Sequence, residues 1–320
     1  MRAIVATQPG GPETLVSTEV PVPAPGPGQL LVQAAAIGVN FIDTYQRSGV
    51  YPAPFPFTPG LEAAGTVTAV GDGVTEFAVG DRVTTSQATA AYAEQFLVDA
   101  ALVARVPESV ELALAGALPL QGVTAHYLAN SSANPQPGEF ALVHAGAGGV
   151  GLLLTQLLAA RGVRVITTAS SQEKRDLSRA AGAEHSIDYA GFAEAVRELT
   201  AGEGAHVAYD GVGKDTFDGS LDALRIRGEL VLFGGASGQV PPVDLQRLNS
   251  GGSLSITRPT STHFMRTAEE RAWRYRELFQ AIADGQLDVR IGARFPLAEA
   301  RAAHEALEGR ATTGKVLLVP

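Results

Sequence analysis

A glycine-rich segment at residues 146–151 is the feature of this chain that points most directly to chemistry. It reads Gly-Ala-Gly-Gly-Val-Gly, which fits the pattern G-x-G-x-x-G. A strand is predicted before it at 139–145 and an apolar helix after it at 152–161, as in a βαβ unit that binds a dinucleotide. The alternative is a structural glycine turn without a ligand. Because the loop has the full strand–loop–helix context, the sequence favours dinucleotide binding.

Each glycine of this loop has its own expected role. Gly146 permits the tight turn, Gly148 lets the backbone approach the pyrophosphate, and Gly151 lets the helix and strand pack closely. The start of the helix offers free N–H groups and the positive end of its dipole to the phosphates. Gly149 and Val150 complete the expected phosphate contact.

The residues after the second strand of this unit, predicted at 163–168, indicate which dinucleotide is bound. NAD enzymes usually carry Asp or Glu there, about 20 residues after the loop, to bind the ribose hydroxyls. Here Ala-Ser-Ser follows, and Lys174 lies in the first turn of the next helix. A lysine at that end of a helix is slightly unfavourable unless an anion lies near, and a 2′-phosphate is such an anion. The alternative is a solvated lysine offset by Glu173 and Asp176; the sequence favours NADP(H).

Composition removes several other classes of function. The 320 residues include no cysteine, which excludes disulfide scaffolds, thiol nucleophiles, iron–sulfur clusters and cysteine-based zinc sites. The net charge is −9 with no basic cluster, which argues against nucleic-acid binding. The N-terminal segment does not resemble a signal peptide, and no apolar run approaches the ~18–20 residues that span a membrane. We expect a cytoplasmic protein.

The elements that must position these residues fall into two regions. Residues 1–110 contain short apolar runs between Gly/Pro turns, and more than half of the 19 prolines lie before residue 60, which predicts a β-rich, irregular barrel. From residue 139 onward, strands alternate with short helices, which predicts a doubly wound parallel sheet. The expected strands are 139–145, 163–168, 186–189, 206–210, 229–233 and an edge strand at 253–257. The expected helices are 152–161, 173–181, 192–200, 216–225 and 268–283, before a last strand at 315–319.

Motifs along nearly the whole chain show a family resemblance. They lie at 36–52 (AIGVNFIDTYQRSGVYP), 59–74 (PGLEAAGTVTAVGDGV), 79–83, 143–156, 209–217, 255–259 and 309–318 (GRATTGKVLL). On these motifs the chain resembles the medium-chain dehydrogenases/reductases, and specifically their zinc-free NADPH:quinone oxidoreductase (zeta-crystallin) branch. The resemblance implies an α/β fold with a GroES-like, β-rich substrate domain at 1–122, joined again by 261–320. A Rossmann domain that binds NADPH is implied at 123–260.

The zinc ligands of related alcohol dehydrogenases are replaced in this sequence. Their first ligand is a cysteine where this chain has Asn40, and their second is the histidine of a G-H-E motif that reads Gly60-Leu61-Glu62 here. Leucine cannot bind a metal. The six histidines show no paired spacing that would rebuild a metal site, and each is expected to be a structural or a surface histidine. We therefore expect no metal.

Quinone reduction requires neither a metal nor a protein nucleophile, because the cofactor supplies the electrons. The resemblance implies that the stretch Asn40–Tyr45 lines the nicotinamide, with Asn40 and Tyr45 as catalytic donors. Arg258 is the third expected catalytic residue. Asn40 followed by Asp43 also fits a helix start, and Asp43 is expected to serve there as the acidic residue.

Further cofactor contacts are carried over from the resemblance position by position. Ser170, Lys174 and Tyr189 are expected at the 2′-phosphate or adenine, and Thr257 at the nicotinamide amide. Packing or surface ion pairs are the alternative roles, notably for Thr124, Arg258 and Arg310. The complete set of expected cofactor residues is Phe41, Ile42, Asp43, Thr44, Thr124, Tyr127, Gly146, Gly148, Gly149, Val150, Gly151, Ser170, Lys174, Tyr189, Gly211, Phe233, Gly234, Gly235, Ala236, Thr257 and Arg310.

Three functions follow from this interpretation. The first is NADPH-dependent reduction of a quinone, with a semiquinone as one conceivable product, in a metal-free cleft between the domains. The second is reduction of an activated C=C bond in an enal, enone or enoyl thioester. The third is a non-catalytic, crystallin-like or RNA-binding protein, which the acidic charge disfavours. If the strands at 229–233 and 253–257 form a sheet edge, that edge needs cover, and we expect a homodimer.

Overall fold

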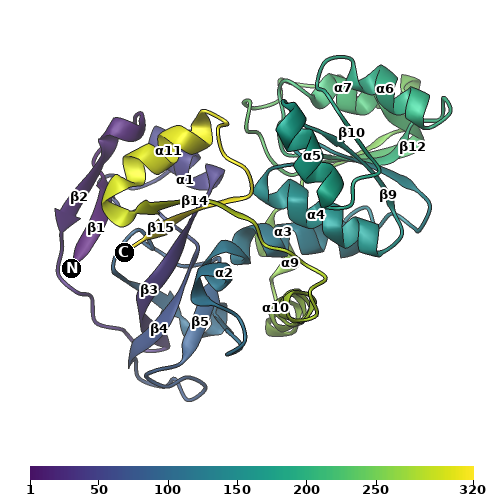
Figure 1. Cartoon of the computed structure of the whole chain (residues 1–320). Helices are drawn as coiled ribbons and strands as arrows, with labels where there is room; N and C mark the ends of the chain where they lie inside the picture. The colour runs from purple at the N-terminus through teal and green to yellow at the C-terminus, as the bar shows by residue number, and fades with distance from the viewer. The chain divides into compact units, whose positions relative to one another are not determined.

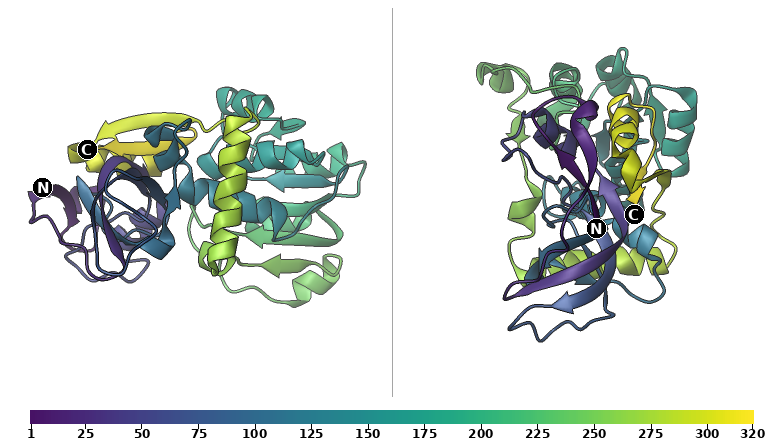
Figure 2. Two further views of the ribbon diagram at one scale, coloured as in Figure 1. Left: turned by 90° about the horizontal axis from the view of Figure 1, so that it is seen from below. Right: turned by 90° about the vertical axis from the view of Figure 1, so that its left-hand side faces the viewer.

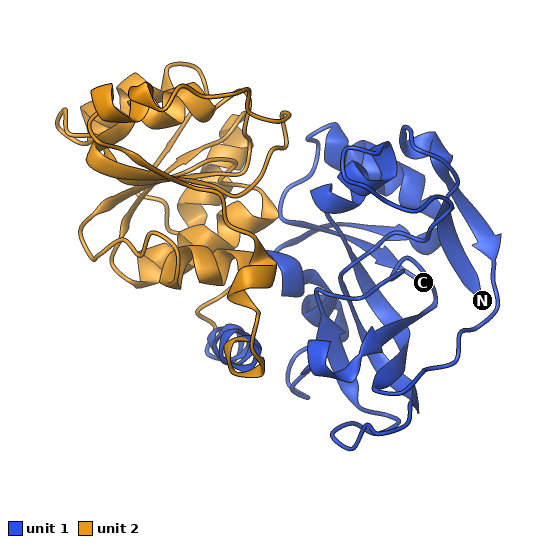
Figure 3. Cartoon of the chain, turned by 180° about the vertical axis from the view of Figure 1, so that it is seen from behind, with its two compact units in different colours: residues 1–121, 271–284, 289–320 blue, residues 122–270, 285–288 orange.

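The computed structural model describes all residues from Met1 to Pro320. The chain forms two compact units, which Figure 3 distinguishes by colour. Unit 1 contains residues 1–121, 271–284 and 289–320, and unit 2 contains residues 122–270 and 285–288. The return to unit 1 thus begins ten residues later than the sequence suggested, inside a helix. No helix is long and apolar enough to cross a membrane.

Unit 1 is built on a seven-stranded sheet with the order β14-β15-β3-β4-β5-β7, to which β6 adds by pairing with β3. A two-stranded ladder, β1-β2, stands apart from it. The strands are β1 (Arg2–Ala6), β2 (Leu15–Glu19), β3 (Gln29–Val39), β4 (Ala63–Val70), β5 (Arg82–Thr85), β6 (Gln95–Asp99), β7 (Ala104–Arg105), β14 (Ile291–Pro296) and β15 (Lys315–Val319). The helices are α1 (Phe41–Ser48), α2 (Leu112–Ala117) and α11 (Ala300–Glu308), with 3-10 turns at Pro12–Thr14, Ala100–Leu102 and Leu297–Glu299.

The long strand β3 explains how the end of the chain joins its beginning. β3 pairs along its length with β4, while β6 pairs with its first half and β15 pairs antiparallel with Ile37–Val39. The C-terminal strand and α11 therefore lie beside elements from the first fifty residues, as Figure 1 shows for α11 and α1. Both termini lie in unit 1 (Figure 3).

Unit 2 contains a six-stranded, fully parallel sheet with the order β10-β9-β8-β11-β12-β13. Its arrows lie side by side in the left view of Figure 2. The strands are β8 (Phe140–Val143), β9 (Arg164–Thr168), β10 (His185–Ile187), β11 (Ala205–Asp210), β12 (Leu224–Leu232) and β13 (Ser255–Thr257). The helices are α4 (Gly149–Ala160), α5 (Gln172–Ala180), α6 (Phe192–Leu199), α7 (Phe217–Asp222), α8 (Gln246–Ser250) and α9 (Ser261–Phe264). Two further helices cross the unit boundary, α3 (Pro119–Asn130) and α10 (Ala268–Ala283).

This order is the doubly wound arrangement 3-2-1-4-5-6, which confirms the predicted Rossmann fold. Its strands read as apolar runs because both faces of a parallel sheet are covered. Leu142, Ile166, Ala208 and Leu230 are completely buried in the core of this unit. The direction of strand order reverses between β8 and β11, so the carboxyl ends of these two strands mark the expected ligand site.

Two sequence predictions about this sheet were wrong. The helix expected at 216–225 ends at Asp222, and Leu224 already begins β12. Because β12 lies between β11 and β13, the strand at 229–233 is internal, and of the two expected edge strands only β13 lies at a sheet edge; β10 forms the opposite edge. The helix at 268–283 and the strand at 315–319 have the predicted bounds.

Candidate active site

The glycine loop lies at the carboxyl end of β8, where the strand order reverses. Gly148 is the N-cap of α4, and its N–H donates to the Ala145 carbonyl at 2.8 Å. A Cβ on Gly151 would lie 2.2 Å from the Ala145 oxygen, so the close approach of helix and loop requires glycine. The turn itself differs from the expectation, since Ala145 (φ 52°) takes the left-handed conformation. Gly146 provides space instead, because a Cβ there would lie 2.5 Å from Thr167 Cβ.

A buried polar network fixes the strand ends beneath this loop. His144 is 1% exposed, and its Nδ1 and Nε2 lie 2.9 Å from Thr168 Oγ1 and Ser220 Oγ. Burial lowers the pKa of His144 to about 4, against the opposing charge of Asp210, so the ring is neutral at neutral pH. Asp210 in turn accepts hydrogen bonds from Ser220 Oγ at 2.9 Å and from the N–H groups of Val212 and Gly213. The sequence indicated only a structural role for His144, and the structure agrees.

Of the residues expected at the 2′-phosphate, Tyr189 lies at the same loop. The Tyr189 hydroxyl accepts a hydrogen bond from the Ala145 N–H at 3.1 Å, and its ring stacks on His144. Lys174 is the third residue of α5, and its N–H donates to the N-cap Ser171 Oγ at 3.3 Å. Asp176, one of the two acids named in the alternative interpretation of Lys174, accepts a hydrogen bond from Arg179 at 2.6 Å. Ser170 is exposed between β9 and α5. The structure therefore brings Tyr189, which the resemblance assigned to the 2′-phosphate or adenine, to the glycine loop.

A second glycine-rich surface follows β11 and β12. A Cβ on Gly211 would lie 2.8 Å from the Phe233 ring, and one on Gly234 would lie 2.6 Å from the Gly211 oxygen. The Ala236 N–H donates to the Gly211 carbonyl at 3.1 Å. Glycines thus let the two loops touch, and Phe233 to Ala236 lie together with Gly211 at the carboxyl edge of the sheet.

The remaining predicted residues of unit 2 have mixed environments. Thr257 is half-buried and donates to Glu229 Oε1 at 2.7 Å, whereas Arg258 is exposed. In α3, Thr124 is half-buried, and Tyr127 is buried and stacked on Phe264 at 4.5 Å. Arg310, in unit 1, is exposed.

The stretch Asn40–Tyr45 forms the N-cap and first turn of α1. Asn40 is the N-cap, and its N–H donates to Asp43 Oδ2 at 2.9 Å, which confirms the helix-start role of Asp43. Asp43 is completely buried and Thr44 nearly so, which leaves the Asp43 side chain no exposed atom for a cofactor. Phe41, Ile42 and Tyr45 are partly exposed and form the accessible face of this turn.

An aromatic surface extends this face. The rings of Phe41 and Tyr45 are 6.2 Å apart, and Tyr45 meets the edge of Tyr51 at 5.4 Å. Such half-buried rings present flat apolar area together with hydroxyl groups. This is the composition expected for contact with a flat, conjugated ligand that carries oxygen atoms.

The side chain of Asn40 is committed to an internal network that the sequence reasoning missed. Its Oδ1 accepts a hydrogen bond from Lys315 Nζ at 2.7 Å, and its Nδ2 donates to Glu62 Oε2 at 2.8 Å. Lys315 and Glu62 form an ion pair in which both side chains are 0% exposed. The expectation that the Asn40 amide donates to a ligand therefore competes with two bonds already made inside the protein. A charged residue inside an apolar run, as in Lys315–Val319, is the signal that could have revealed this pair.

A second buried series of hydrogen bonds starts at Asp43. Arg47 can only donate, so His304 Nδ1, 3.0 Å away, is an acceptor, and His304 Nε2 carries the hydrogen. Nε2 then donates to Tyr92 Oη at 3.0 Å, and Tyr92 donates to Asp43 Oδ2 at 3.0 Å. Arg47 also pairs with Glu308 at 2.7 Å. This series of hydrogen bonds connects α11 to the start of α1.

Burial strongly shifts the pKa values of Asp43 and His304 in this hydrogen-bond series. It raises the pKa of Asp43 to about 7, although the hydrogen bonds from Asn40 and Tyr92 oppose the shift. The second oxygen of Asp43, Oδ1, has no hydrogen-bond partner. Burial, together with the charge of Arg47, lowers the pKa of His304 to about 3. His304 is therefore a neutral structural histidine, as the sequence suggested.

The donor atoms around Asn40 do not suit zinc. Asn40 Oδ1 already binds an ammonium group, Leu61 offers no ligating atom, and no group of three His, Cys, Asp or Glu residues is arranged to hold a metal ion. The positions that hold zinc in the related alcohol dehydrogenases therefore carry no zinc ligand set in this chain.

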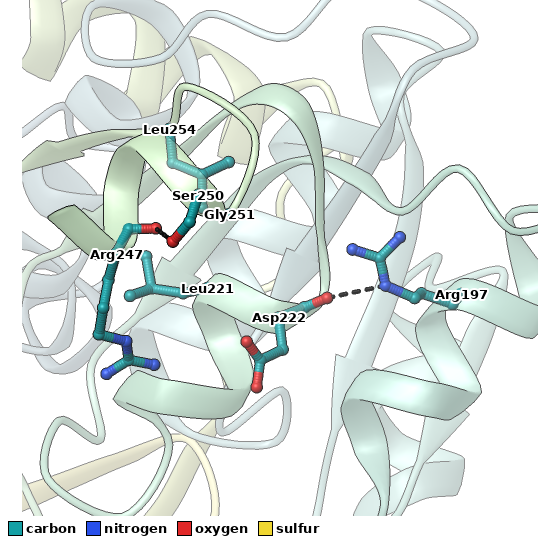
Figure 4. Close-up of a pocket in the computed structure, with 7 residues that line it drawn as sticks. All are labelled: Arg197, Leu221, Asp222, Arg247, Ser250, Gly251 and Leu254. Atoms are coloured by element: carbon teal, nitrogen blue, oxygen red, sulfur yellow. Dashed lines mark hydrogen bonds between the residues drawn. The ribbon is translucent and has the colours of Figure 1, made fainter.

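A separate pocket of about 360 Å³ lies on unit 2, away from these residues (Figure 4). Its arginines serve the protein itself: Arg197 Nε donates to the Asp222 carbonyl at 2.9 Å, and Arg247 pairs with Asp218 at 2.6 Å. The pocket lies at the start of β13, on the amino edge of the sheet, where parallel sheets do not usually bind ligands. It is lined by Arg197, Leu221, Asp222, Arg247, Ser250, Gly251 and Leu254.

Comparisons with known proteins agree with this arrangement. The family "Zinc-binding dehydrogenase" matches residues 149–278, and "Alcohol dehydrogenase GroES-like domain" matches 26–134. A quinone oxidoreductase of Pseudomonas aeruginosa is 45% identical and covers 97% of each chain. A 2-haloacrylate reductase of a Burkholderia species is 42% identical over 99% of this chain and 98% of that protein. A mycobacterial protein solved in complex with NADPH is 53% identical, with a TM-score of 0.98 and 100% of both chains covered. The chain therefore belongs to the quinone oxidoreductases of the medium-chain dehydrogenase/reductase superfamily.

Proposed function

We propose that this protein is a zinc-independent, NADPH-dependent quinone reductase. The carboxyl edge of the unit 2 sheet is the observation that carries the proposal. There, a phosphate-binding loop opens α4, the residues Ala-Ser-Ser directly after β9 include no carboxylate, and the hydroxyl group of Tyr189 is bonded to the loop. The relatives support the same conclusion, since one is named a quinone oxidoreductase and another was solved with NADPH.

The residues of the chain then have the following roles. When bound, NADPH supplies the reducing electrons. The N–H groups at the start of α4 bind its pyrophosphate, and Lys174 and Tyr189 bind the 2′-phosphate. Residues Gly211 and Phe233 to Ala236 line the ribose with backbone atoms. Thr124, Tyr127, Thr257 and Arg310 are proposed as further cofactor contacts.

On unit 1, we assign the acceptor to the aromatic face of α1. Phe41 and Tyr45 contact the flat ring, and the Tyr45 hydroxyl donates to an acceptor oxygen. Asn40 acts mainly by holding the start of this helix, and Arg258 is proposed to face the acceptor.

The test is oxidation of NADPH, followed at 340 nm, with a panel of acceptors and with NADH as the comparison. The panel contains 9,10-phenanthrenequinone, 1,4-benzoquinone, a 2-alkenal, an enoyl-CoA and 2-chloroacrylate. We expect turnover with the quinones and preference for NADPH. Binding of NADPH without turnover of any acceptor would reject the substrate assignment and leave the cofactor assignment intact.

Reduction of an activated C=C bond is the second candidate. The 42% identity to a 2-haloacrylate reductase favours it, because that protein is equally similar over its full length. Tyr45 would then be positioned to protonate the carbon skeleton after reduction. Turnover with only the alkenal, the enoyl-CoA or 2-chloroacrylate would establish this alternative.

We also propose that the protein is a cytoplasmic homodimer that pairs through the edge of the unit 2 sheet. β13 is the edge strand, and an uncovered edge exposes unpaired N–H and C=O groups. Ile226 and Leu245 are 73% and 70% exposed, and Ile226 lies against the turn at Gly252 that leads to β13. The net charge of −9 supports a function without nucleic acid.

A further inference from the structure

Glu62 is a completely buried carboxylate between two helix starts. It lies just before β4, and its side chain is 0% exposed. Its Oε1 accepts a hydrogen bond from the Leu120 N–H at 2.7 Å. Its Oε2 accepts one from Asn40 Nδ2 at 2.8 Å and another from Lys315 Nζ. One carboxylate thus bonds to the second residue of α3 and to the N-cap of α1.

This carboxylate binds a free backbone N–H at the start of α3 and the side-chain amide of the N-cap at the start of α1. The first N–H groups of a helix lack partners within the helix, and Pro119 at the first position of α3 has no N–H to offer. The N–H of Leu120 is therefore the first donor of α3, and a negative charge is favourable at this end of the helix. At α1, the amide of Asn40 is held between Glu62 and Lys315, so it has a single orientation.

Lys315 makes the burial of this carboxylate possible. Its side chain is also 0% exposed, and an unpaired buried charge of either sign would be strongly unfavourable. The ion pair lies directly on β3, because a Cβ on Gly38 would come within 2.0 Å of Glu62 Oε2 and 2.8 Å of Lys315 Cε. Glycine at 38 therefore lets the pair sit against the strand that leads into α1.

We propose that Glu62 is a positioning residue that sets the starts of α1 and α3 together. The inference rests on the proposed function, because α1 carries Tyr45 and α3 carries Thr124, the residues assigned to acceptor and nicotinamide. A role in stability alone would not require these contacts, since apolar side chains of similar volume often replace a buried ion pair without loss. Here, both carboxylate oxygens of Glu62 are bonded to a helix start, and one of them is also bonded to the lysine that neutralises the charge.

Two charge-neutral double variants of the full-length protein test this role. Glu62→Leu with Lys315→Met removes every bond to the helix starts. Glu62→Gln with Lys315→Met is the matched control, because the glutamine oxygen can still accept from the Leu120 N–H and, once the Asn40 amide turns over in the absence of Lys315, its NH₂ can donate to Asn40 Oδ1. Neither variant leaves a buried charge unpaired. The measurements are thermal unfolding, NADPH affinity by fluorescence, amide hydrogen exchange in the first turns of α1 and α3, and kcat and KM with the acceptor.

We expect the Leu/Met variant to fold and to keep most of its NADPH affinity, because the glycine loop and α5 are untouched. Its first-turn amides in α1 and α3 should exchange faster, and its kcat should fall about 10²-fold, the order of loss that a misplacement near 1 Å causes. The Gln/Met variant should keep the amide protection and most of kcat. A folded Leu/Met variant with wild-type kcat would overturn the proposal.

If the Leu/Met variant does not fold, the Gln/Met variant decides. Loss of its kcat while both helix starts stay protected would overturn the proposal, and retention of both would support it. Amide exchange is measured without cofactor or acceptor, so it tests whether Glu62 holds the two helix starts even if the proposed function is wrong. Absence of quinone turnover by the wild type would reject that function alone, and kcat would then be compared with whichever acceptor the wild type reduces.

Discussion

Among single residues, Asp43 shows how burial and hydrogen bonding compete over one carboxyl group. Two donors, the Asn40 N–H and the Tyr92 hydroxyl, stabilise the charged form at Oδ2. Burial favours the neutral form more strongly and raises the pKa to about 7. Since Oδ2 already accepts two hydrogen bonds, the proton of the neutral form belongs on the unpartnered Oδ1.

This shift predicts a pH-dependent stability. Between the unfolded pKa of 3.8 and the folded value of about 7, the folded chain keeps a proton that the unfolded chain has lost. The contribution is fully present below pH 3.8 and is lost as the pH rises through about 7, with a slope of at most about 1.4 kcal/mol per pH unit. Asp43→Asn removes it, so the unfolding free energy of wild type minus variant should fall between about pH 5 and about pH 7.

Denaturant unfolding of both proteins over this range gives that difference directly. The depressed pKa of His304 acts in the opposite direction, but it is present in both proteins and cancels to first order. A difference that stays flat with pH would show that Asp43 is ionised in the folded state throughout.

Lys174 carries the prediction about cofactor choice. If its ammonium group binds the 2′-phosphate, Lys174→Ala should weaken NADPH binding about tenfold or more and leave NADH unchanged, since a charged hydrogen bond contributes about 1.5–3 kcal/mol. Arg179→Ala is the control, because it removes one positive charge from the last turn of the same helix. Affinities from fluorescence titration decide, and an equal loss for both cofactors would contradict the assignment.

At the scale of elements, two glycines at the start of α4 serve different purposes, one for helix packing and one for cofactor binding. Gly151 and Gly148 lie three residues apart, yet their surroundings differ. A Cβ on Gly151 would lie 2.2 Å from a backbone oxygen, and one on Gly148 would lie 3.1 Å from the same atom. The first requires the helix to move, whereas the second fits after a small adjustment.

Alanine at each position should therefore have a different effect. Gly151→Ala should destabilise the protein by about 1–3 kcal/mol, as overpacking does, and weaken NADPH binding as well. Gly148→Ala should keep nearly wild-type stability but weaken NADPH binding, because its methyl group occupies the approach to the pyrophosphate. The stability of each variant is measured by thermal unfolding in the absence of cofactor. Its NADPH affinity is measured by titration. Unchanged affinity in Gly148→Ala would mean that the phosphates lie elsewhere.

At the scale of the whole molecule, the open edge of the unit 2 sheet determines the expected assembly. The apolar side chains of Ile226, in the neighbouring strand β12, and of Leu245 are exposed to water in the single chain, as is the edge strand β13. A two-fold axis at this edge would cover both the backbone groups and these side chains in one step.

Light scattering should therefore give twice the chain mass of 33.1 kDa at micromolar concentration. Ile226→Lys should shift the equilibrium towards the monomer, because it places two like charges near the proposed axis. Leu97, which is half-buried in β6 of unit 1, offers a distant control as Leu97→Lys. A wild-type protein of single-chain mass would reject the dimer.

The sequence alone determined the features that depend on local pattern. The apolar runs and glycine loop of residues 139–168 predicted parallel strands around a dinucleotide site, and α10 and β15 have the predicted bounds. The order Asn40–Asp43 predicted the start of α1. Such features are readable because residues within a few positions of each other decide them. The same locality explains the error at 216–225, where helical periodicity continued past Asp222 into a strand that sheet pairing defines.

Only the tertiary structure decided which charged side chains are buried and with what they pair. Glu62 and Lys315 are 253 positions apart and meet because β15 pairs with β3. Asp43 reaches His304 through Tyr92 for the same reason, since α11 returns to the start of the chain. In the sequence, Glu62 was only the remnant of a metal motif and Lys315 the first residue of a strand. Periodicity reports which face of an element is apolar, but the partner of a buried charge depends on the order of strands in the sheet.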